Sequence, residues 1–243
     1  MKILITMAGE GQRFKDIGLS TPKYKLKAKN KTLFEWSISS LLSFREYPFI
    51  FMISGEMSDN LFINKILKKL GIHDFSILNI SNTTDGQATT ALLADSLLKD
   101  TDSVGIYNID TYVEPGLLTI NDITSEFQGF IPVMKGSGPK YSYVKVDQNG
   151  YVIEVAEKIE ISQLATIGFY YFKQWGDFKK IYFAKREEIK TTYKEVFIAP
   201  LYNYLIQDNK KVGIKIIDKE KVNILGTPAD IILFDKYFLT KNI

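Results

Sequence analysis

The chain has no cysteine and only one histidine among its 243 residues. The absence of thiols excludes disulfides, cysteine-ligated zinc or iron–sulfur centres, and a cysteine nucleophile. One histidine, His73, excludes a multi-histidine metal centre and disfavours a serine–histidine–aspartate triad. Its place in KKLGIHDF is typical of a surface connection between a helix and a strand. A metal in this protein would therefore be held by oxygen ligands, which favours Mg²⁺.

Long apolar runs and an excess of one charge are also missing. No run approaches the roughly 18 apolar residues of a membrane-spanning helix. The apolar start MKILITM meets Gly9, Glu10 and Gly11 too early for a signal peptide. The 31 basic and 28 acidic residues give a net charge of +3, without the clustered excess of a nucleic-acid-binding protein. We therefore expect a soluble, cytoplasmic protein that binds neither membranes nor nucleic acid.

Strands and helices alternate in the patterning of the first part of the chain. Short β-branched runs predict strands, and apolar residues at helical spacing predict the helices between them. Thr32 and Glu35 form a capping-box pattern at the start of the first long helix. The order is typical of an α/β fold with a doubly wound, mostly parallel sheet. The predicted strands are 2–6, 48–54, 75–80 and 103–109, and the predicted helices are 32–44, 60–71 and 86–98.

The second part of the chain is richer in predicted strands. Asn149-Gly150 is a strong hairpin signal between two of them. Pro228 is well placed at the first position of a final helix. Because no linker or repeat interrupts the chain, we expect one domain with a β-rich second half. The predicted strands here are 129–134, 141–147, 151–157, 165–172 and 212–217, and the predicted helices are 174–187, 195–208 and a last one from about 228.

A glycine loop follows the first strand in ILITMAGEGQRF. Glycines in this place let the backbone approach a ligand, and exposed N–H groups suit phosphate oxygens. The loop is neither a G-x-G-x-x-G dinucleotide fingerprint nor a Walker A motif. Arg13 instead follows the second glycine, and Lys23 comes ten residues later behind Pro22. Both cations are suited to binding phosphate groups. The simpler alternative is that the glycine loop is only a tight turn and binds no ligand.

Two later segments carry groups suited to a nucleotide. Gly86 and Gln87 open the predicted helix 86–98, where a glutamine amide can both donate to and accept from a base edge. Asp110 ends a predicted strand, at the sheet edge where α/β proteins bind ligands, and its carboxylate suits Mg²⁺. For Gly86 and Gln87, the alternative is an ordinary helix start capped by Asp85. For Asp110, the alternative is that its side chain only caps the next element.

Lysines alternate at every second position in STPKYKLKAKNK, from Lys23 to Lys31. An extended segment would point all five in one direction. The pattern therefore suggests either a basic surface for a polyanion or one reactive lysine among solvated neighbours. Coming after the glycine loop, it favours Lys23 as the reactive one and predicts a short extended segment that leads to the first long helix.

The order of these motifs along nearly the whole chain resembles the sugar-phosphate nucleotidyltransferase family, also called nucleotide-sugar pyrophosphorylases. The loop GEGQR with Pro22-Lys23 looks like the family's G-x-G-x-R and Pro-Lys signature. The segments DGQATTALLA, NID, Glu157-Lys158 and GTPADI look like its base-reading, metal-binding, acceptor-phosphate and C-terminal segments. The resemblance implies a Rossmann-like, three-layer αβα fold with a mixed central sheet. It also implies a nucleotide-binding half at 1–125 and an acceptor-binding half at 126–243.

The resemblance further implies a reaction between a nucleoside triphosphate and a phosphorylated small molecule that releases pyrophosphate and uses Mg²⁺. Such a reaction needs positioning and positive charge, not a histidine base or a cysteine nucleophile. The implied site residues fall into four groups. They are Arg13 and Lys23 for catalysis; Ala8, Gly9, Gly11, Gln12, Asp85, Gly86 and Gln87 for the nucleotide; Glu157, Lys158, Gly168 and Glu195 for the acceptor; and Asp110 and Asn223 for the metal.

Two positions depart from the family's pattern. Members often carry a second metal carboxylate just before the late Gly-Thr, where this chain has VNILGTP and Asn223 is the nearest polar candidate. The residue two after the Pro-Lys lysine is often apolar, and here it is Lys25. The first departure leaves the second metal ligand open, and the second leaves the role of Lys25 open.

Several functions remain compatible with the sequence. The leading one uses CTP or UTP to activate a sugar phosphate for cell-surface polysaccharide, in a chain that can form a homo-oligomer. A close alternative is a cytidylyltransferase for a non-sugar phosphate such as a phosphorylated choline or amino acid. A glycosyltransferase of related fold is disfavoured, because it has no triphosphate tail to bind. A non-catalytic nucleotide or sugar sensor and a polyanion-binding protein are the remaining alternatives.

Overall fold

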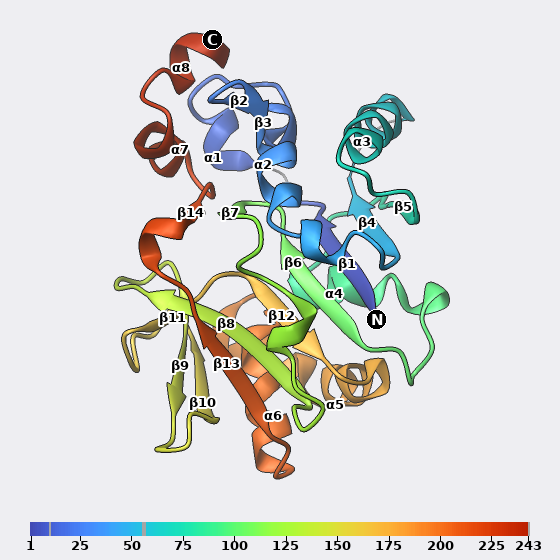
Figure 1. Cartoon of the computed structure of the whole chain (residues 1–243), viewed down its shortest axis with the longest axis vertical. Coiled ribbons are helices and arrows are strands. Elements are labelled where there is room, and N and C mark those ends of the chain that lie inside the picture. The colour runs from blue at the N-terminus through green and yellow to red at the C-terminus, as the bar shows by residue number, and fades with distance from the viewer. Residues whose placement is uncertain (10, 55–56, 243) are drawn as a thin grey trace.

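The computed structural model describes residues 1–9, 11–54 and 57–242 (Figure 1). Within these residues, ten strands form a mixed central sheet flanked by helices, as predicted. Two small two-stranded sheets, β7 with β14 and β2 with β3, lie outside it. The strands are β1 (Lys2–Met7), β2 (Lys27–Ala28), β3 (Lys31–Thr32), β4 (Phe49–Ile53), β5 (Phe75–Asn79), β6 (Val104–Asn108), β7 (Thr111–Val113), β8 (Gly129–Lys135), β9 (Ser142–Val146), β10 (Val152–Glu157), β11 (Leu164–Thr166), β12 (Phe169–Phe172), β13 (Val212–Ile216) and β14 (Val222–Ile224).

The order of the main sheet is β10-β9-β11-β8-β12-β6-β1-β4-β5, with β13 paired to β8. Strands β6, β1, β4 and β5 are parallel neighbours, and β13 is parallel to β8. Strand β12 runs antiparallel to both β6 and β8 and so joins the parallel part to the antiparallel hairpin region. The carboxyl ends of β1 and β6 therefore open toward one edge of the sheet, where α/β proteins bind ligands.

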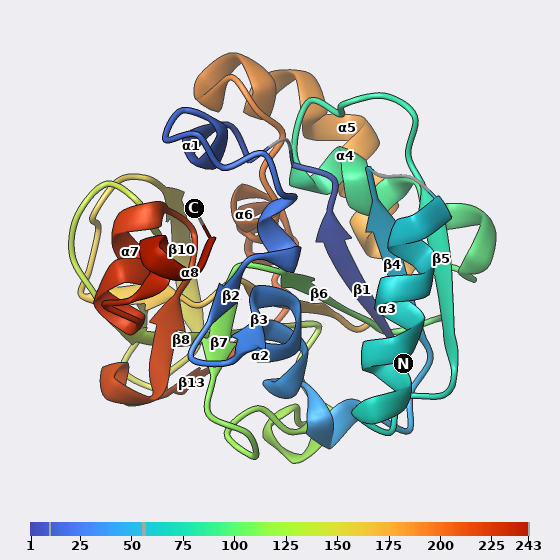
Figure 2. The same ribbon diagram turned by 90° about the horizontal axis from the view of Figure 1, so that it is seen from above.

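The helices cover both faces of the sheet, as Figure 2 shows from above. Alternate residues of β1 reach opposite cores: Leu4 packs with residues of α4, α5 and α6, whereas Ile3 and Ile5 pack with residues of α2 and α3. This alternation follows from the two-residue period of a strand that is buried on both faces. The helices are α1 (Gln12–Lys15), α2 (Leu33–Ser39), α3 (Met57–Lys69), α4 (Gln87–Leu92), α5 (Trp175–Tyr193), α6 (Tyr202–Gln207), α7 (Pro228–Phe234) and α8 (Phe238–Asn242).

Several local predictions are confirmed. Thr32 and Glu35 form the expected capping box at the start of α2, and Pro228 stands at the start of α7. The turn at Asn149-Gly150 joins β9 to β10, and Gly150 has the positive φ of 83° that such a turn requires. No helix in the described ranges combines the length and the apolar character needed to cross a membrane.

Four predicted elements are shorter than expected. The helix predicted at 195–208 forms only from Tyr202, since the backbone of Val196 bonds to Asp85 and Ala88 instead of to its own turn. The strand predicted at 165–172 breaks between β11 and β12, where Gly168 has a φ of 81°. The helix predicted at 86–98 ends at Leu92, and that predicted at 32–44 ends at Ser39; each is followed by a short 3-10 turn.

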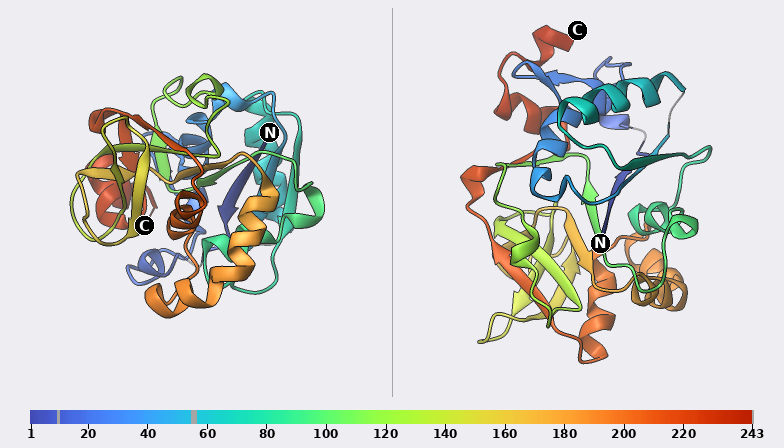
Figure 3. Two further views of the ribbon diagram at one scale, coloured as in Figure 1. Left: turned by 90° about the horizontal axis from the view of Figure 1, so that it is seen from below. Right: turned by 45° about the vertical axis from the view of Figure 1, so that its right-hand side comes forward.

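The C-terminal helices return to the segment that follows the glycine loop. In Figure 1, and in the right-hand view of Figure 3, α7 and α8 lie beside β2, β3 and α1. Asp235 accepts a hydrogen bond of 2.6 Å from the backbone N–H of Lys29, and Asn242 accepts one of 2.9 Å from that of Lys27. Trp36 packs edge-on against Phe234, with ring centroids 5.2 Å apart. These contacts bring the late GTPADI segment to the edge of the sheet where β1 ends.

Candidate active site

A cleft of about 1010 Å³ opens at the carboxyl ends of β1 and β6. Loops from both parts of the chain form its walls, so residues far apart in the sequence face one space. The predicted residues that line it are Ala8, Gly9, Gly11, Gln12, Arg13, Lys23, Gly86, Gln87, Asp110, Glu157, Lys158, Gly168 and Glu195. Of the predicted set, Asp85 and Asn223 do not line it, and Glu10 of the glycine motif lies outside the described residues.

The glycine loop forms one end of the cleft. Gly11 adopts a left-handed conformation with φ of 65° and begins the short helix α1, which carries Gln12 and Arg13. The buried ring of Phe14 anchors that helix to the core. Lys23 lies next to this turn, since a Cβ at Gly11 would be in ordinary contact, 3.6 Å, with the Cβ of the lysine. The glycine thus permits the left-handed turn that leads into α1 beside Lys23.

Lys23 lines the cleft beside Asp110. Its ammonium lies 3.0 Å from Oδ2 of Asp110 and donates to the carbonyl oxygen of Gly226 at 3.3 Å. It also lies 5.4 Å from the centroid of the Phe14 ring. The lysine side chain is only 17% exposed, whereas that of Asp110 is 34% exposed. A fixed positive charge therefore stands beside the strand-end carboxylate.

The segment Gly86-Gln87 borders another side of the cleft. The amide nitrogen of Gln87 donates to Oγ1 of Thr6 at 3.0 Å and to the side-chain oxygen of Asn108. These two residues belong to β1 and β6, so the sheet itself orients the amide. Asn108 in turn packs closely against the backbone of Gly168. Any side chain at that position would clash with it, because a Cβ there would lie 2.7 Å from the asparagine Nδ2.

The opposite wall carries a buried carboxylate next to an exposed cation. Glu157 is 6% exposed and accepts a hydrogen bond from the hydroxyl of Ser142. Burial, together with the charge of Glu195, raises the pKa of Glu157, although Ser142 and the charge of Lys158 oppose the shift. Lys158 has a φ of 60°, and its ammonium lies 4.4 Å from the centroid of the Phe197 ring.

The oxygen donors of the cleft fit a hard cation such as Mg²⁺. A Cβ built on Gly226 would lie 3.5 Å from Oδ2 of Asp110 and 3.8 Å from Oδ2 of Asp230, so two carboxylates flank the space left by this glycine. Asn223 pairs with Tyr112 in the small β14–β7 sheet instead. In the described ranges no three histidine, aspartate or glutamate side chains gather as a metal site. A bound Mg²⁺ would thus also need phosphate or water ligands, as is usual for this ion.

Four residues of the site were missed by sequence reasoning. Thr6 and Asn108 orient Gln87, and Lys140 forms an ion pair of 2.7 Å with Asp230 at the rim of the cleft. Asp230 had a signal, because it stands three residues after Thr227 in a capping-box pattern, and it does close that box. For Lys140 no local pattern pointed to the cleft.

The series of lysines adopts a different conformation from the extended one expected. Lys23 and Lys25 lie in a 3-10 turn, and a tight hairpin follows in which Lys29 has a φ of 44°. Lys25 turns away from the cleft and pairs with the buried Asp59 of α3. The other lysines therefore do not extend the positive surface around Lys23. Lys29 lies over the ring of Phe234 at 4.0 Å and Lys31 over that of Trp36 at 4.5 Å.

Comparison with known proteins agrees with this arrangement. A nucleoside-diphosphate-sugar pyrophosphorylase from Vibrio cholerae RC9 shares 32% sequence identity over 96% of this chain and 99% of its own, with a TM-score of 0.87. The inositol-1-phosphate CTP transferase from T. maritima shares 17% identity over 94% of this chain and 90% of its own, with a TM-score of 0.72. A UDP-glucose pyrophosphorylase complexed with UDP-glucose shares 17% identity over 99% and 98%, with a TM-score of 0.73. The last two likenesses concern the fold.

No curated protein matches the chain in a sequence comparison. The sequence pattern that defines the nucleotidyl transferase family, in contrast, matches residues 2–232, which is nearly the whole chain. The match spans both walls of the cleft, from the glycine loop to α7. The chain therefore belongs to the nucleotidyl transferase family.

Proposed function

We propose that this nucleotidyltransferase couples CTP or UTP to a phosphorylated small molecule, with a sugar phosphate as the favoured acceptor. The observation that carries the proposal is the position of Lys23 between the glycine loop and the Asp110 carboxylate. There a fixed cation faces the space where a triphosphate would meet the end of the sheet. In the cytoplasm, such a product would serve as an activated precursor for cell-surface polysaccharide.

In the proposed reaction, an acceptor phosphate oxygen attacks the α-phosphorus of the triphosphate. The bond from that phosphorus to the α,β-bridging oxygen breaks, and pyrophosphate leaves with the bonding electron pair. The acceptor phosphate is already anionic, so no general base is required. Bound Mg²⁺ would neutralise phosphate charge, with Asp110 as its protein ligand.

The positions of the cationic side chains suggest their individual roles. Arg13 and the amides of the glycine loop would hold the leaving β- and γ-phosphates, because a guanidinium can form paired hydrogen bonds with phosphate oxygens. Lys23 would stabilise the charge that develops around the α-phosphorus. Lys158, on the opposite wall, would hold the acceptor phosphate. The two phosphates would then approach each other from opposite ends of the cleft.

The hydrogen bonds of Gln87 support a base with a donor at its pairing edge. Both hydrogens of its amide are engaged, by Thr6 and Asn108, and the described residues provide no donor for its carbonyl oxygen. That oxygen can accept from the N4 amine of cytosine or from N3–H of uracil. The same wall would therefore serve either pyrimidine nucleotide.

A matrix of nucleoside triphosphates against phosphorylated acceptors, followed by pyrophosphate release, tests the proposal. The acceptors should include sugar 1-phosphates, a polyol phosphate, phosphocholine and a phosphorylated amino acid. We expect release that depends on both substrates, strongest with CTP or UTP. Turnover with phosphocholine alone would identify a non-sugar acceptor. No release with any pair, while nucleotides still bind, would favour a sensor.

A further inference from the structure

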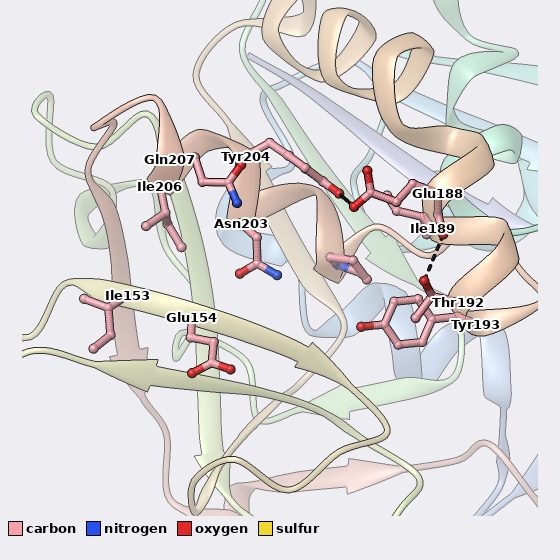
Figure 4. Close-up of a pocket in the computed structure, with 11 residues that line it drawn as sticks. Ile153, Glu154, Glu188, Ile189, Thr192, Tyr193, Asn203, Tyr204, Ile206 and Gln207 are labelled. Carbon is pink, nitrogen blue, oxygen red and sulfur yellow. Dashed lines mark hydrogen bonds between the residues drawn. The ribbon is translucent and has the colours of Figure 1, made fainter.

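The segment that follows α5 forms a wall between two hollows. Glu195 and Phe197 line the cleft described above. Pro200, from the same short segment, and Tyr193, the last residue of α5, line a second pocket of about 430 Å³ between α5, α6 and β10 (Figure 4). The wall is thus one short stretch of chain, and its position determines where Glu195 and Phe197 lie in the acceptor part of the cleft.

This wall is attached by its backbone to the segment that carries Gln87. The N–H of Val196 donates to the carbonyl oxygen of Asp85 at 2.8 Å, and the N–H of Ala88 donates to the carbonyl oxygen of Val196 at 2.9 Å. A Cβ on Gly86 would lie 2.5 Å from both the nitrogen and the oxygen of Val196. Only a glycine permits this close approach, which joins the nucleotide wall to the acceptor wall.

The carboxylate of Asp85 strengthens the same junction from the side. It lies 2.9 Å from the ammonium of Lys190 and 3.5 Å from the guanidinium of Arg186, both on α5. It also accepts a hydrogen bond from Thr89 of α4, whose hydroxyl lies 3.0 Å from that of Tyr182. Partial burial alone would raise the pKa of Asp85, but Thr89, Lys190 and Arg186 lower it. The carboxylate is thus ionised and bridges α4 to the last turns of α5.

We propose that Asp85 is a positioning residue that holds the wall after α5 against the nucleotide segment, and so sets the acceptor site. Its side chain acts through Lys190 and Arg186 and does not touch the nucleotide. The inference rests on the proposed function for its kinetic consequence, whereas its structural consequence does not depend on any substrate. Because Glu195 and Phe197 follow Lys190 closely in the chain, loosening the end of α5 displaces acceptor-side groups first.

The test compares Asp85→Asn and Lys190→Met with the wild-type protein. Asp177→Asn is the matched control. Asp177 is also on α5, but its ion pair of 2.6 Å joins that helix to Lys210, which follows α6, and does not involve the wall. We expect the first two variants to raise the acceptor KM by about 3–10-fold while kcat stays within about two-fold, since a partly exposed ion pair contributes up to about 1 kcal/mol. The double variant should be no worse than the more affected single one. The control should lower thermal stability comparably without changing the acceptor KM.

Amide hydrogen exchange supplies a readout that requires no turnover. The amides of Val196 and Ala88 should exchange faster in Asp85→Asn and Lys190→Met than in the wild-type protein or the control. Unchanged exchange at both amides overturns the proposal, even if no substrate is found. A rise in the nucleotide KM alone also overturns it, because Asp85 would then contact the nucleotide directly. If the wild-type protein releases no pyrophosphate, the proposed function fails, and exchange alone decides the role of Asp85.

Discussion

Lys23 differs from the lysines that follow it in the group that each one faces. Lys23 meets Asp110 inside the cleft, Lys25 meets the buried Asp59, and Lys29 lies over an aromatic ring. Alternation along the sequence therefore does not produce one charged surface, because the backbone turns between them. A single ammonium remains beside the strand-end carboxylate.

We predict that Lys23→Ala lowers kcat by roughly 10²–10³-fold, comparable to the loss of one well-placed donor to a developing oxyanion. The melting temperature should change little, because a partly exposed ion pair contributes about 1 kcal/mol or less. Lys27→Ala is the control, since its side chain is exposed and it should retain full activity. A normal kcat in Lys23→Ala would contradict the proposed role.

Glu157 provides a prediction on pH. Burial raises the pKa of Glu157 above its ordinary value, so folding favours the protonated form of this group more than the unfolded chain does. Stability is thus greatest below the unfolded-state pKa and falls as the pH rises through the folded-state pKa. Glu157→Gln, which keeps a polar partner for Ser142, should be more stable than the wild-type protein at pH 8, and the difference should shrink toward pH 4.5. Thermal melts across this range measure it; a constant difference would show that ionisation is not the cause.

At the scale of secondary structure, local patterns located most elements, but tertiary contacts decided where several of them end. The capping box of α2 and the turn at Gly150 depend on neighbours within a few residues, so they could be predicted. The break between β11 and β12 could not, because it depends on Asn108 in another strand approaching Gly168. The helix predicted at 195–208 was shortened by bonds to a segment about a hundred residues earlier in the chain.

Gly168→Ala tests the element scale. The backbone at this position has a φ of 81°, which strains an alanine, and the added Cβ would lie 2.7 Å from Nδ2 of Asn108. Asn108 in turn orients Gln87. We expect a loss of about 1–3 kcal/mol in stability and a higher nucleotide KM. Gly150→Ala is matched in backbone strain, with a φ of 83°, but its Cβ meets open space. It should lose stability while nucleotide affinity stays normal; equal kinetic effects in both variants would refute the specific role of Asn108.

At the scale of the whole molecule, the C-terminal segment and the N-terminal glycine loop line the same cleft. The carbonyl oxygen of Gly226 accepts a hydrogen bond from the ammonium of Lys23, 203 residues earlier in the chain. The carboxylate of Asp235 accepts one from the backbone N–H of Lys29. The C-terminal helices therefore stabilise the loop that positions Lys23.

Asp235→Asn tests this closure. Hydrogen bonds from Lys241 and from the backbone of Lys29 lower the pKa of Asp235 to about 2. Its ionised form thus stabilises the fold above the ordinary pKa of 3.8, and this contribution is lost as the pH falls through about 2. The variant should be less stable by about 1–2 kcal/mol at pH 7, and the difference should narrow toward pH 2–3. Urea unfolding at several pH values measures it, and a deficit that does not change with pH would contradict this origin.

The sequence by itself determined the chemistry available to this protein: phosphate-binding cations after a glycine loop, a strand-end carboxylate, and no thiol or histidine chemistry. Motif order also pointed to the family, because short motifs and periodic patterns are local properties. Only the tertiary structure decided that Lys23 meets Asp110, that Asp230 flanks Gly226 while Asn223 lies elsewhere, and that Asp85 faces α5. Those contacts depend on strand order and on chain closure over long separations, which no local pattern encodes.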